Sequence, residues 1–587
     1  MKPASRRLEP NLRLKLDSRR STLALAVCFI GFTLLLGRAL QLQVLESGFL
    51  RAKGESRFVR VVDLPASRGA IMDRHGKPLA ISTPVESIWA SPAELKADAA
   101  QLASLATALG IDEKSLATRV ADKSRDFVWL KRQLPPEEAK RAMQLKLEGV
   151  FQQREYRRYY PAGDVAAHVI GFTGLTDEGI DDKGLEGIEL AQQATLAGAV
   201  GKKSVIKDKK GRIVEDIQNI RAPRDGKPLN LSLDERFQNL AHRELKTAVD
   251  LHKAKGGALV MLDAKTGEVL ALVNQPDFNP NNRKNVSLAQ MRNSSVTDVF
   301  EPGSTFKPFT VSAALEAGIV TPETIITTGP GLTVGPKTFT DLPHRSTQLS
   351  VAEIIQQSSN IGTAKLALKL PSETLWSLYS ALGFGAFTQS GFPGERRGHL
   401  TPLDKSHGWK PIEQATMAFG LGVSVSAIQL ARAYTIFTND GVLLPVTFLK
   451  RESDVIGRQV ISKKTANSMA KMLETVTQAG GTAKKGQVSG YRIAGKTGTA
   501  HKYVRALGRY SETHYTSSFV GYGPATNPRY IIAVVIDEPG AGLHFGGDVS
   551  APVFSNVMTQ ALRMSNVMPD AEDYREASAP STVKERG

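Results

Sequence analysis

Cysteine is almost absent from the chain: Cys28 is the only one among 587 residues. A single thiol excludes an internal disulfide framework, so the folded parts must be stabilised by their apolar cores. A chain of this length can hold more than one such core, and we predict about three folded units.

Spacings typical of metal ligands are also missing. No Cys and His residues, and no His and Glu residues, recur at the separations of known zinc sites. We therefore predict that the protein uses no metal and no cofactor.

Charge is moderate in amount but unequal in sign. Charged residues make up 23% of the chain and hydrophobic residues 41%, which is typical of a globular protein. A net charge of +17 is compatible with nucleic-acid binding, but seven of the basic residues lie within the first 20 positions, beside an apolar stretch. This pattern indicates that the basic segment lies against a membrane, and we predict no nucleic-acid partner.

The apolar stretch, residues 21–37, carries no charge and lies between Arg19-Arg20 and Arg38. We predict a transmembrane helix over residues 21–41, because flanking arginines can reach the headgroups and lengthen a short span. A cleaved signal peptide is the alternative, but the run exceeds a usual signal-peptide core and no small-x-small cleavage site follows. The positive-inside rule places residues 1–20 in the cytoplasm and the chain after about residue 42 outside.

Three short strings follow one another in the second half of the chain: Ser304-Thr305-Phe306-Lys307, Ser358-Ser359-Asn360 and Lys496-Thr497-Gly498-Thr499. Each is weak alone, because Ser-x-x-Lys also begins at Ser204, Ser468 and Ser581, and a second Lys-Thr-Gly begins at Lys265. Sequence context distinguishes them.

Ser304 has the context of a helix start. Residues 301–303 predict a turn and residues 305–318 a helix, in which Pro308 is tolerated only in the first turn. Ser304 and Lys307 then lie on one helix face. In contrast, residues 265–267 join two apolar runs and predict a hairpin turn.

In this order the three strings resemble the motif set of penicillin-binding proteins and serine β-lactamases. Residues 68–76, 157–161 and 184–189 resemble signatures of the non-catalytic module of class B penicillin-binding proteins. Residues 300–303, 357–362, 521–529 and 546–554 are similar to the division-specific FtsI type, penicillin-binding protein 3. The resemblance covers most of residues 15–565.

The resemblance implies a multi-domain α+β fold. We expect an elongated pedestal and head over residues 56–225, and a transpeptidase domain over 229–563 with an antiparallel sheet flanked by helices and an all-helical subdomain. From the residues themselves, 92–147 predict an inserted helical head, 501–515 a loop, and 565–587 a disordered tail. The Arg, Asp and Glu residues of the pedestal signatures are interpreted as ion pairs that stabilise it. No glycosyltransferase domain fits between anchor and pedestal, which argues against the bifunctional class.

The resemblance also implies roles for the three strings. Ser304 is the expected nucleophile and Lys307 its base, after burial and nearby positive charge lower the pKa of the amine from about 10.4. Ser358 would relay a proton to the leaving amine, Asn360 would hold Lys307 or a substrate amide, and Lys496 would supply positive charge. Thr497 and Thr499 are expected to bind the substrate carboxylate, and Gly498, which has no side chain, is expected to admit the substrate backbone. The backbone N–H groups of Ser304 and Thr499 are expected to form the oxyanion hole.

The function implied is a D,D-transpeptidase that crosslinks septal peptidoglycan through a Ser304 acyl-enzyme and is inhibited covalently by β-lactam antibiotics. Its expected partners are stem peptides ending in D-Ala-D-Ala, a membrane glycosyltransferase of the SEDS type and other divisome proteins. Its expected place is the inner membrane, with a periplasmic catalytic domain. Two alternatives stay open: a D,D-carboxypeptidase-type hydrolase, and a divisome scaffold or β-lactam sensor without turnover.

Overall fold

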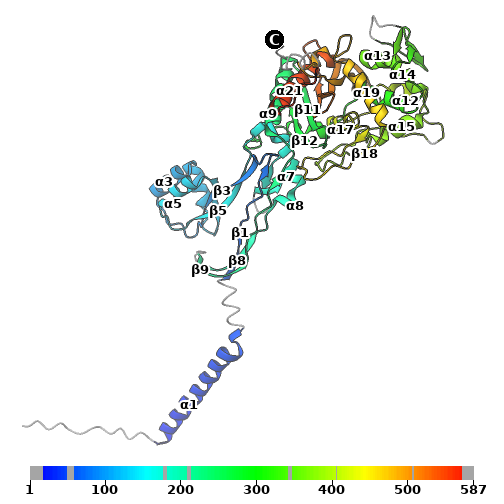
Figure 1. Cartoon of the computed structure of the whole chain (residues 1–587). Coiled ribbons are helices and arrows are strands. Elements are labelled where there is room, and N and C mark those ends of the chain that lie inside the picture. The colour runs from blue at the N-terminus through cyan, green and yellow to red at the C-terminus, as the bar shows by residue number, and fades with distance from the viewer. Residues whose placement is uncertain are drawn as a thin grey trace, which may run out of the picture.

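The computed structural model describes residues 18–48, 59–175, 181–207, 213–341, 347–404, 406–504 and 508–571. A separate helix, an elongated pedestal with a head on its side, and a large domain follow one another in space (Figure 1). Most of the predicted cytoplasmic segment, 1–20, and most of the predicted tail, 565–587, lie outside the described residues.

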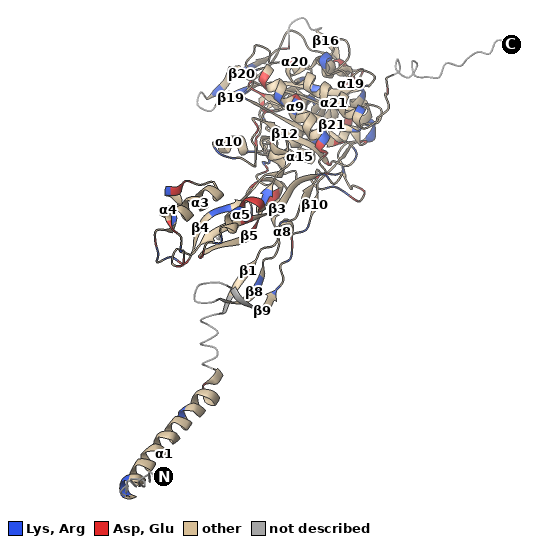
Figure 2. Cartoon of the chain, turned by 90° about the vertical axis from the view of Figure 1, so that its left-hand side faces the viewer, with Lys and Arg blue, Asp and Glu red and all other residues tan. Residues whose placement is uncertain are grey.

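The separate helix is α1 (Ser18–Leu40), which continues through a short π-helical turn, η1 (Gln41–Leu45). Over Ser18–Leu45 the chain is long and apolar enough to cross a membrane, with a mean hydropathy of 2.2 in its most apolar window, and no residue of that window is buried by protein. Basic residues mark its start (Figure 2). An apolar helix without a protein cover needs another apolar environment, which is consistent with a single membrane anchor.

The pedestal is built from strands of widely separated parts of the chain. β1 pairs with β8 and β8 with β9, and a second sheet has the order β10-β2-β3-β4 with β5 also paired to β3. The bounds are β1 (Val59–Leu64), β2 (Ile71–Met72), β3 (Pro78–Ala90), β4 (Val128–Leu134), β5 (Val150–Tyr159), β6 (Thr173–Leu175), β7 (Asp181–Gly184), β8 (Gly201–Lys207), β9 (Ile213–Arg221) and β10 (Leu229–Asn230). Short helices accompany these strands: η2 (Gly163–Ala166), α6 (Ala167–Ile170), α7 (Gly187–Ala191) and α8 (Gln193–Leu196).

The predicted ion pairing inside the pedestal is confirmed. Arg68 Nε and Arg158 Nε each donate to one carboxylate oxygen of Glu189 at 2.6 Å, and all three side chains are buried. Because buried charges are stable only when paired, this cluster holds the pedestal strands and α7 together.

The head differs from the sequence prediction, since it is not only helical. Of its helices, α4 (Glu113–Val120) packs on β4 and α5 (Pro136–Gln144) packs on β3 and β5, while α3 (Ala99–Leu109) packs on α4 and α5. Ile88, Leu105 and Leu130 contribute to a separate buried core. The sequence analysis did not predict β4. Two basic residues, Lys131-Arg132, lie in the middle of this strand, and it is buried only at alternate or terminal positions, so no apolar run marks it.

The large domain contains an antiparallel sheet in the order β12-β11-β21-β20-β19. Every residue of β11 (Gly256–Asp263) and β12 (Val269–Gln275) is buried, so helices must cover both faces. The helices α9 (Glu235–Leu251) and α21 (Ala551–Met564) pack together and on the sheet, and α17 (Ala427–Ala433) packs on β11 and β21 (Tyr530–Asp537). The predicted hairpin turn at 265–267 joins β11 to β12, with Gly267 at φ +70°.

The subdomain beside this sheet is predominantly helical. Three two-stranded sheets, which neither periodicity nor resemblance indicated, lie within it. The helices are α10 (Leu288–Met291), α11 (Ser294–Thr297), η3 (Gly303–Phe306), α12 (Lys307–Glu316), α13 (Val351–Gln357), α14 (Asn360–Leu368), α15 (Ser372–Ala381), α16 (Pro411–Met417), α18 (Thr435–Thr438) and α19 (Lys463–Thr475). Two further short elements, η4 (Lys484–Gly486) and α20 (Gly546–Val549), pack on α21, and α20 also packs on β19 (Ala494–Val504) and β20 (Arg509–Gly523). The strands are β13 (Ile325–Thr327), β14 (Leu332–Val334), β15 (Lys337–Phe339), β16 (Gln348–Ser350), β17 (Val442–Leu443) and β18 (Arg458–Gln459).

The predicted loop over 501–515 is largely a β-hairpin. β19 (Ala494–Val504) and β20 (Arg509–Gly523) stay paired out to Tyr503 opposite Tyr510, whose rings meet at 5.4 Å. Cross-strand aromatic pairs stabilise such ribbons, whereas the basic residues between them suggested a loop. Residues 505–507, with Arg505, are outside the described part of the chain.

Candidate active site

Ser304 lies at a helix start, as the sequence predicted. It is in the 3₁₀ turn η3, which passes directly into α12, and Pro308 occupies the first turn of that helix. Tyr434 donates its hydroxyl hydrogen to Thr305 O at 2.8 Å, and Thr305 Oγ1 donates to Pro302 O at 2.8 Å. These bonds hold the turn that carries Ser304.

Lys307 and Ser358 are brought together although 51 residues separate them. Lys307 is completely buried, and its Nζ donates to Ser358 O at 2.6 Å and to Ser358 Oγ at 3.2 Å. Ser358 ends α13 in a left-handed conformation, with φ +62°. A non-glycine residue in this region is strained, and such strain is concentrated at functional sites. Here it directs both oxygens of Ser358 to the amine.

Asp341 supports this turn, and the sequence did not indicate it. Its carboxylate accepts from Ser359 Oγ at 2.5 Å, from Asn360 N at 2.6 Å and from Ile361 N at 3.2 Å, so it caps α14. The Asn360 amide donates to Thr340 O at 3.4 Å. The separation of 18 residues from Ser359 leaves no local signal that could have identified Asp341.

The strand β19 places Lys496 on the nucleophile's side. A Cβ atom added to Gly498 would lie 2.8 Å from Pro302 O and 2.9 Å from Thr305 Cγ2, so the Gly498 face of the strand packs on η3. Lys496 shares this face because side chains alternate along a strand. It is completely buried, and its Nζ donates to Thr497 O and Thr497 Oγ1 at 3.3 Å each. The Lys496 side chain therefore bends back toward Thr497, which faces the cavity described below.

The two threonines of this strand lie on the other face. Thr497 Oγ1 is 2.8 Å from Thr482 Oγ1, and Thr499 Oγ1 accepts from Gly546 N at 3.0 Å. Thr482 was not predicted, because it belongs to the turn after α19 and to no motif. Gly546 begins residues 546–554, one of the stretches that resemble the division-specific type.

These elements surround a cavity of about 700 Å³. Lys307, Lys496 and Gly498 are buried behind its wall, and the other predicted residues line it. Tyr515 and His544 add a stacked pair at 4.1 Å that the sequence did not predict. The lining residues are Ser304, Ser358, Asn360, Gly481, Thr482, Lys484, Lys485, Thr497, Thr499, His501, Tyr515, His544, Phe545, Gly546, Gly547 and Asp548.

The electrostatics of the cavity favour a substrate with a negative end. Lys484 and Lys485 line it and Lys496 lies behind it, whereas the one acidic lining residue, Asp548, is paired with Lys485 at 2.7 Å. Just before the nucleophile's turn, burial raises the pKa of Glu301, whose Oε1 accepts from Gly422 N and from the Tyr510 hydroxyl. The site thus combines a hydroxyl next to a buried amine with hydroxyl and amide groups that can bind an anion. This combination can perform acyl transfer.

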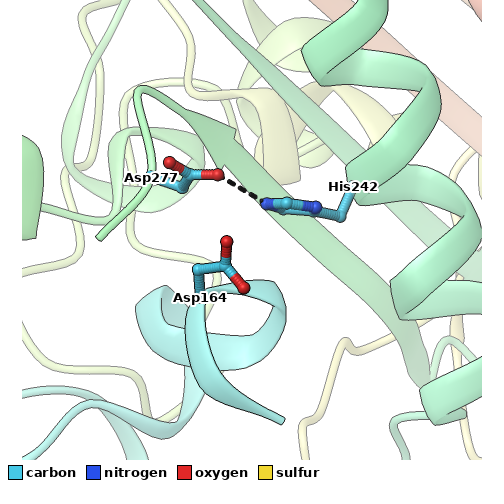
Figure 3. Close-up of side chains that lie close together, drawn as sticks. All are labelled: Asp164, His242 and Asp277. Carbon is cyan, nitrogen blue, oxygen red and sulfur yellow. Dashed lines mark hydrogen bonds and ion pairs between the residues drawn. The ribbon is translucent and has the colours of Figure 1, made fainter. Parts of the chain in front are cut away.

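Three possible metal ligands, Asp164, His242 and Asp277, also come together, which their sequence spacing did not suggest (Figure 3). His242 Nε2 lies 2.8 Å from Asp277 Oδ2, and Lys246 Nζ donates to the same oxygen at 2.9 Å. The bonds from His242 and Lys246 hold the pKa of Asp277 well below its usual range. Because an ammonium group already neutralises this carboxylate, we interpret His242, Lys246 and Asp277 as an ion-pair network within the large domain, with Asp164 of η2 close to it.

The chain matches two protein-family models. Residues 257–559 match the penicillin-binding protein transpeptidase domain and residues 63–231 the penicillin-binding protein dimerisation domain. The peptidoglycan D,D-transpeptidase FtsI of Escherichia coli K12 is 41% identical over 94% of this chain and 93% of its own length. The probable peptidoglycan D,D-transpeptidase PenA of Neisseria gonorrhoeae is 42% identical over the same shares.

Solved structures agree with these relatives. The transpeptidase domain of Burkholderia pseudomallei penicillin-binding protein 3 is 44% identical, covers 58% of this chain and 98% of its own, and has a TM-score of 0.53. Mycobacterium tuberculosis penicillin-binding protein 3 with aztreonam is 26% identical, covers 87% and 98%, and has a TM-score of 0.67. With both of its large parts matched in order, the chain belongs to the family of penicillin-binding protein transpeptidases.

Proposed function

We propose that the protein is a serine-type peptidoglycan D,D-transpeptidase that crosslinks stem peptides at the division septum. One observation carries the proposal: the buried Lys307 amine bonds Ser358, and Ser304 and Ser358 line one cavity with Thr497 and Thr499. The expected nucleophile, proton relay and anion ligands thus surround one space, and the expected base is bonded to the relay from behind its wall, as acyl transfer requires.

Acylation would begin with attack of Ser304 Oγ on the carbonyl carbon of the penultimate D-Ala. The hydroxyl proton passes to the Lys307 amine, which burial favours in its neutral form. The N–H groups of Ser304 and Thr499 stabilise the oxyanion. Ser358, bonded to Lys307, relays the proton to the leaving amine, and D-Ala departs as the peptide C–N bond breaks. The amine of a neighbouring stem then attacks the ester, loses its proton by the same route, and frees Ser304.

The terminal carboxylate of the donor stem would bind at Thr497 and Thr499, with the charge of Lys496 behind them. Asn360 faces the same cavity and is suited to a substrate amide. The position of Gly498 supports a role different from the expected one: its missing side chain lets β19 approach η3, so it acts by positioning the site. A β-lactam would mimic the D-Ala-D-Ala end and remain bound to Ser304.

The helix α1 would anchor the protein in the inner membrane, with residues 1–20 cytoplasmic and the large domain periplasmic. For partners, the division-specific resemblance supports a SEDS-type glycosyltransferase and other divisome proteins. A glycosyltransferase would supply the strands that this transpeptidase crosslinks.

The experiment is mass mapping of the penicilloyl adduct, combined with product analysis on stem peptides. We expect one adduct on Ser304, no label on Ser304→Ala, and unchanged labelling of Ser468→Ala, which alters another Ser-x-x-Lys string. An adduct on another serine would refute the assignment of the nucleophile. Release of D-Ala without crosslinks would identify a hydrolase instead.

A further inference from the structure

A second cavity, of about 400 Å³, lies where the pedestal meets the large domain. Its walls come from the end of β5, from Thr173 of β6 and from residues 280–284, which follow β12. It shares no lining residue with the catalytic cavity. The mechanism proposed above makes no use of it.

The walls of this cavity carry positive charge only, among the residues that the structure describes. Arg157, Arg158, Arg283 and Lys284 line it, and no described carboxylate does. The remaining lining groups are neutral and mostly polar, including Gln133 and Thr173. Positive charge gathered in a hollow attracts anions more strongly than the same charge on a flat surface.

The contacts of Arg158 show why the positive charge of this cavity favours a bound anion. Its side chain is 1% exposed; Nε donates to Glu189, and Nη1 donates to Ser82 Oγ at 3.1 Å, but Nη2 has no hydrogen-bond partner in the described structure. Glu189 also accepts from Arg68, so two buried guanidinium groups share one carboxylate. A buried donor without a hydrogen-bond partner is costly unless an acceptor such as an anion binds beside it.

The cavity is held in shape from both domains. Asn281 Nδ2 donates to Tyr160 O at 2.9 Å, and Asn281 Oδ1 accepts from Tyr160 N at 3.0 Å. The Arg283 guanidinium lies 4.0 Å from the centre of the Phe172 ring, which orients it. Arginines that are already oriented lose little entropy when they bind a carboxylate.

We propose that this cavity is a second peptidoglycan site, which binds the carboxylates of an uncrosslinked stem peptide while another stem occupies the catalytic cavity. The choice of ligand rests on the proposed function, because stem peptides are the acidic chains that this family acts on. The size of the cavity fits a short peptide rather than a folded surface, and arginines and amides suit carboxylate and peptide groups. A stem bound here would bridge the pedestal and the large domain.

The test uses the full chain in detergent after acylation with penicillin, so that the catalytic cavity is closed. The probe is a fluorescent disaccharide pentapeptide, with its binding followed by anisotropy. We expect saturable binding that becomes about tenfold weaker in Arg283→Gln and in Arg157→Gln. A probe with amidated carboxylates should also bind more weakly. Arg563→Gln, which changes an exposed arginine of α21, should bind the probe as the wild type does. Penicillin labelling of each variant verifies its folding.

Several outcomes would overturn the proposal. The first is that the acylated protein does not bind the probe. The second is that both arginine variants bind the probe as tightly as the wild type does. The third is tighter binding of a polyglutamate peptide than of the stem peptide, which would indicate that an acidic protein segment is the ligand. In each case penicillin would still label Ser304 if the proposed function is right, so the two failures are distinguishable.

Discussion

At the scale of single residues, the catalytic cavity depends on groups that do not line it. Lys307 and Lys496 are both fully buried, and Asp341 positions Ser359 and the start of α14 without reaching the cavity. Activity should therefore respond to residues that only hold others in place.

Asp341→Ala tests this dependence. The change removes three hydrogen bonds from the turn after Ser358, so we expect a loss of about 1–2 kcal/mol in the free energy of unfolding. The rate of penicillin acylation should fall roughly 10- to 100-fold, because the Ser358 hydroxyl is no longer held beside Lys307. Stopped-flow acylation and thermal unfolding measure the two effects. Asp404→Ala, which removes an exposed turn cap, is the control and should leave acylation unchanged.

His168 predicts a pH dependence of stability. Burial lowers its pKa from 6.5 to about 4, although its Nε2 bonds Gln290 O at 2.8 Å and Asp277 lies near. Between these pH values the unfolded chain binds a proton that the folded chain does not, so stability falls as the pH falls from 6.5 toward 4. The shift corresponds to about 3 kcal/mol.

We expect His168→Gln to flatten this part of the curve of unfolding free energy against pH, measured by denaturant titration at several pH values. The exposed His407→Gln should keep the wild-type slope. An unchanged slope in His168→Gln would show that other groups cause the acid sensitivity.

At the scale of elements, the site is the contact of an edge strand with a helix start. β19 is the last strand of the sheet, and its Gly498 face packs on η3, which carries Ser304. Ser304 therefore shares a cavity with Thr497 and Thr499 only while these two elements stay in close contact.

Gly498→Ala should separate them. The added methyl group would lie 2.3 Å from Ser518 Oγ and 2.8 Å from Pro302 O, so β19 must shift away from the nucleophile. We expect a loss of about 1–3 kcal/mol in stability and nearly complete loss of penicillin labelling. Gly486→Ala, whose new methyl group would meet side-chain atoms no closer than 3.3 Å, should keep both. Normal acylation of Gly498→Ala would show that the strand has room to move without harm.

At the scale of the whole molecule, the pedestal separates the large domain from α1 (Figure 1). No residue in the most apolar window of α1 is buried by the rest of the protein, so the folded domains do not depend on that helix. The two hydrogen bonds between Asn281 and Tyr160 instead tie the pedestal to the large domain.

Removal of residues 1–58 should therefore give a protein that stays in the soluble fraction and reacts with penicillin at the rate of the full chain. Carbonate extraction and ultracentrifugation distinguish the two proteins, and labelled penicillin measures the rate. A truncated protein that still sediments with membranes would place a second membrane contact in the pedestal or the large domain.

Local patterns in the sequence predicted much of this protein, because the physics behind them is local. The helix start at Ser304, the turn at 265–267 and the apolar helix near the N-terminus each depend on a few neighbouring residues. The resemblance of the three strings then indicated the family and the class of chemistry.

Contacts between distant segments required the folded chain. Asp341 beside Ser359, Thr482 beside Thr497, the cationic cavity at the junction and the network around Asp277 combine residues that no local pattern connects. The packing of η3 against Gly498 likewise decides which way the Lys496 face of β19 is turned. Sequence periodicity shows that two faces alternate, but only packing against a neighbouring element decides which face meets the nucleophile.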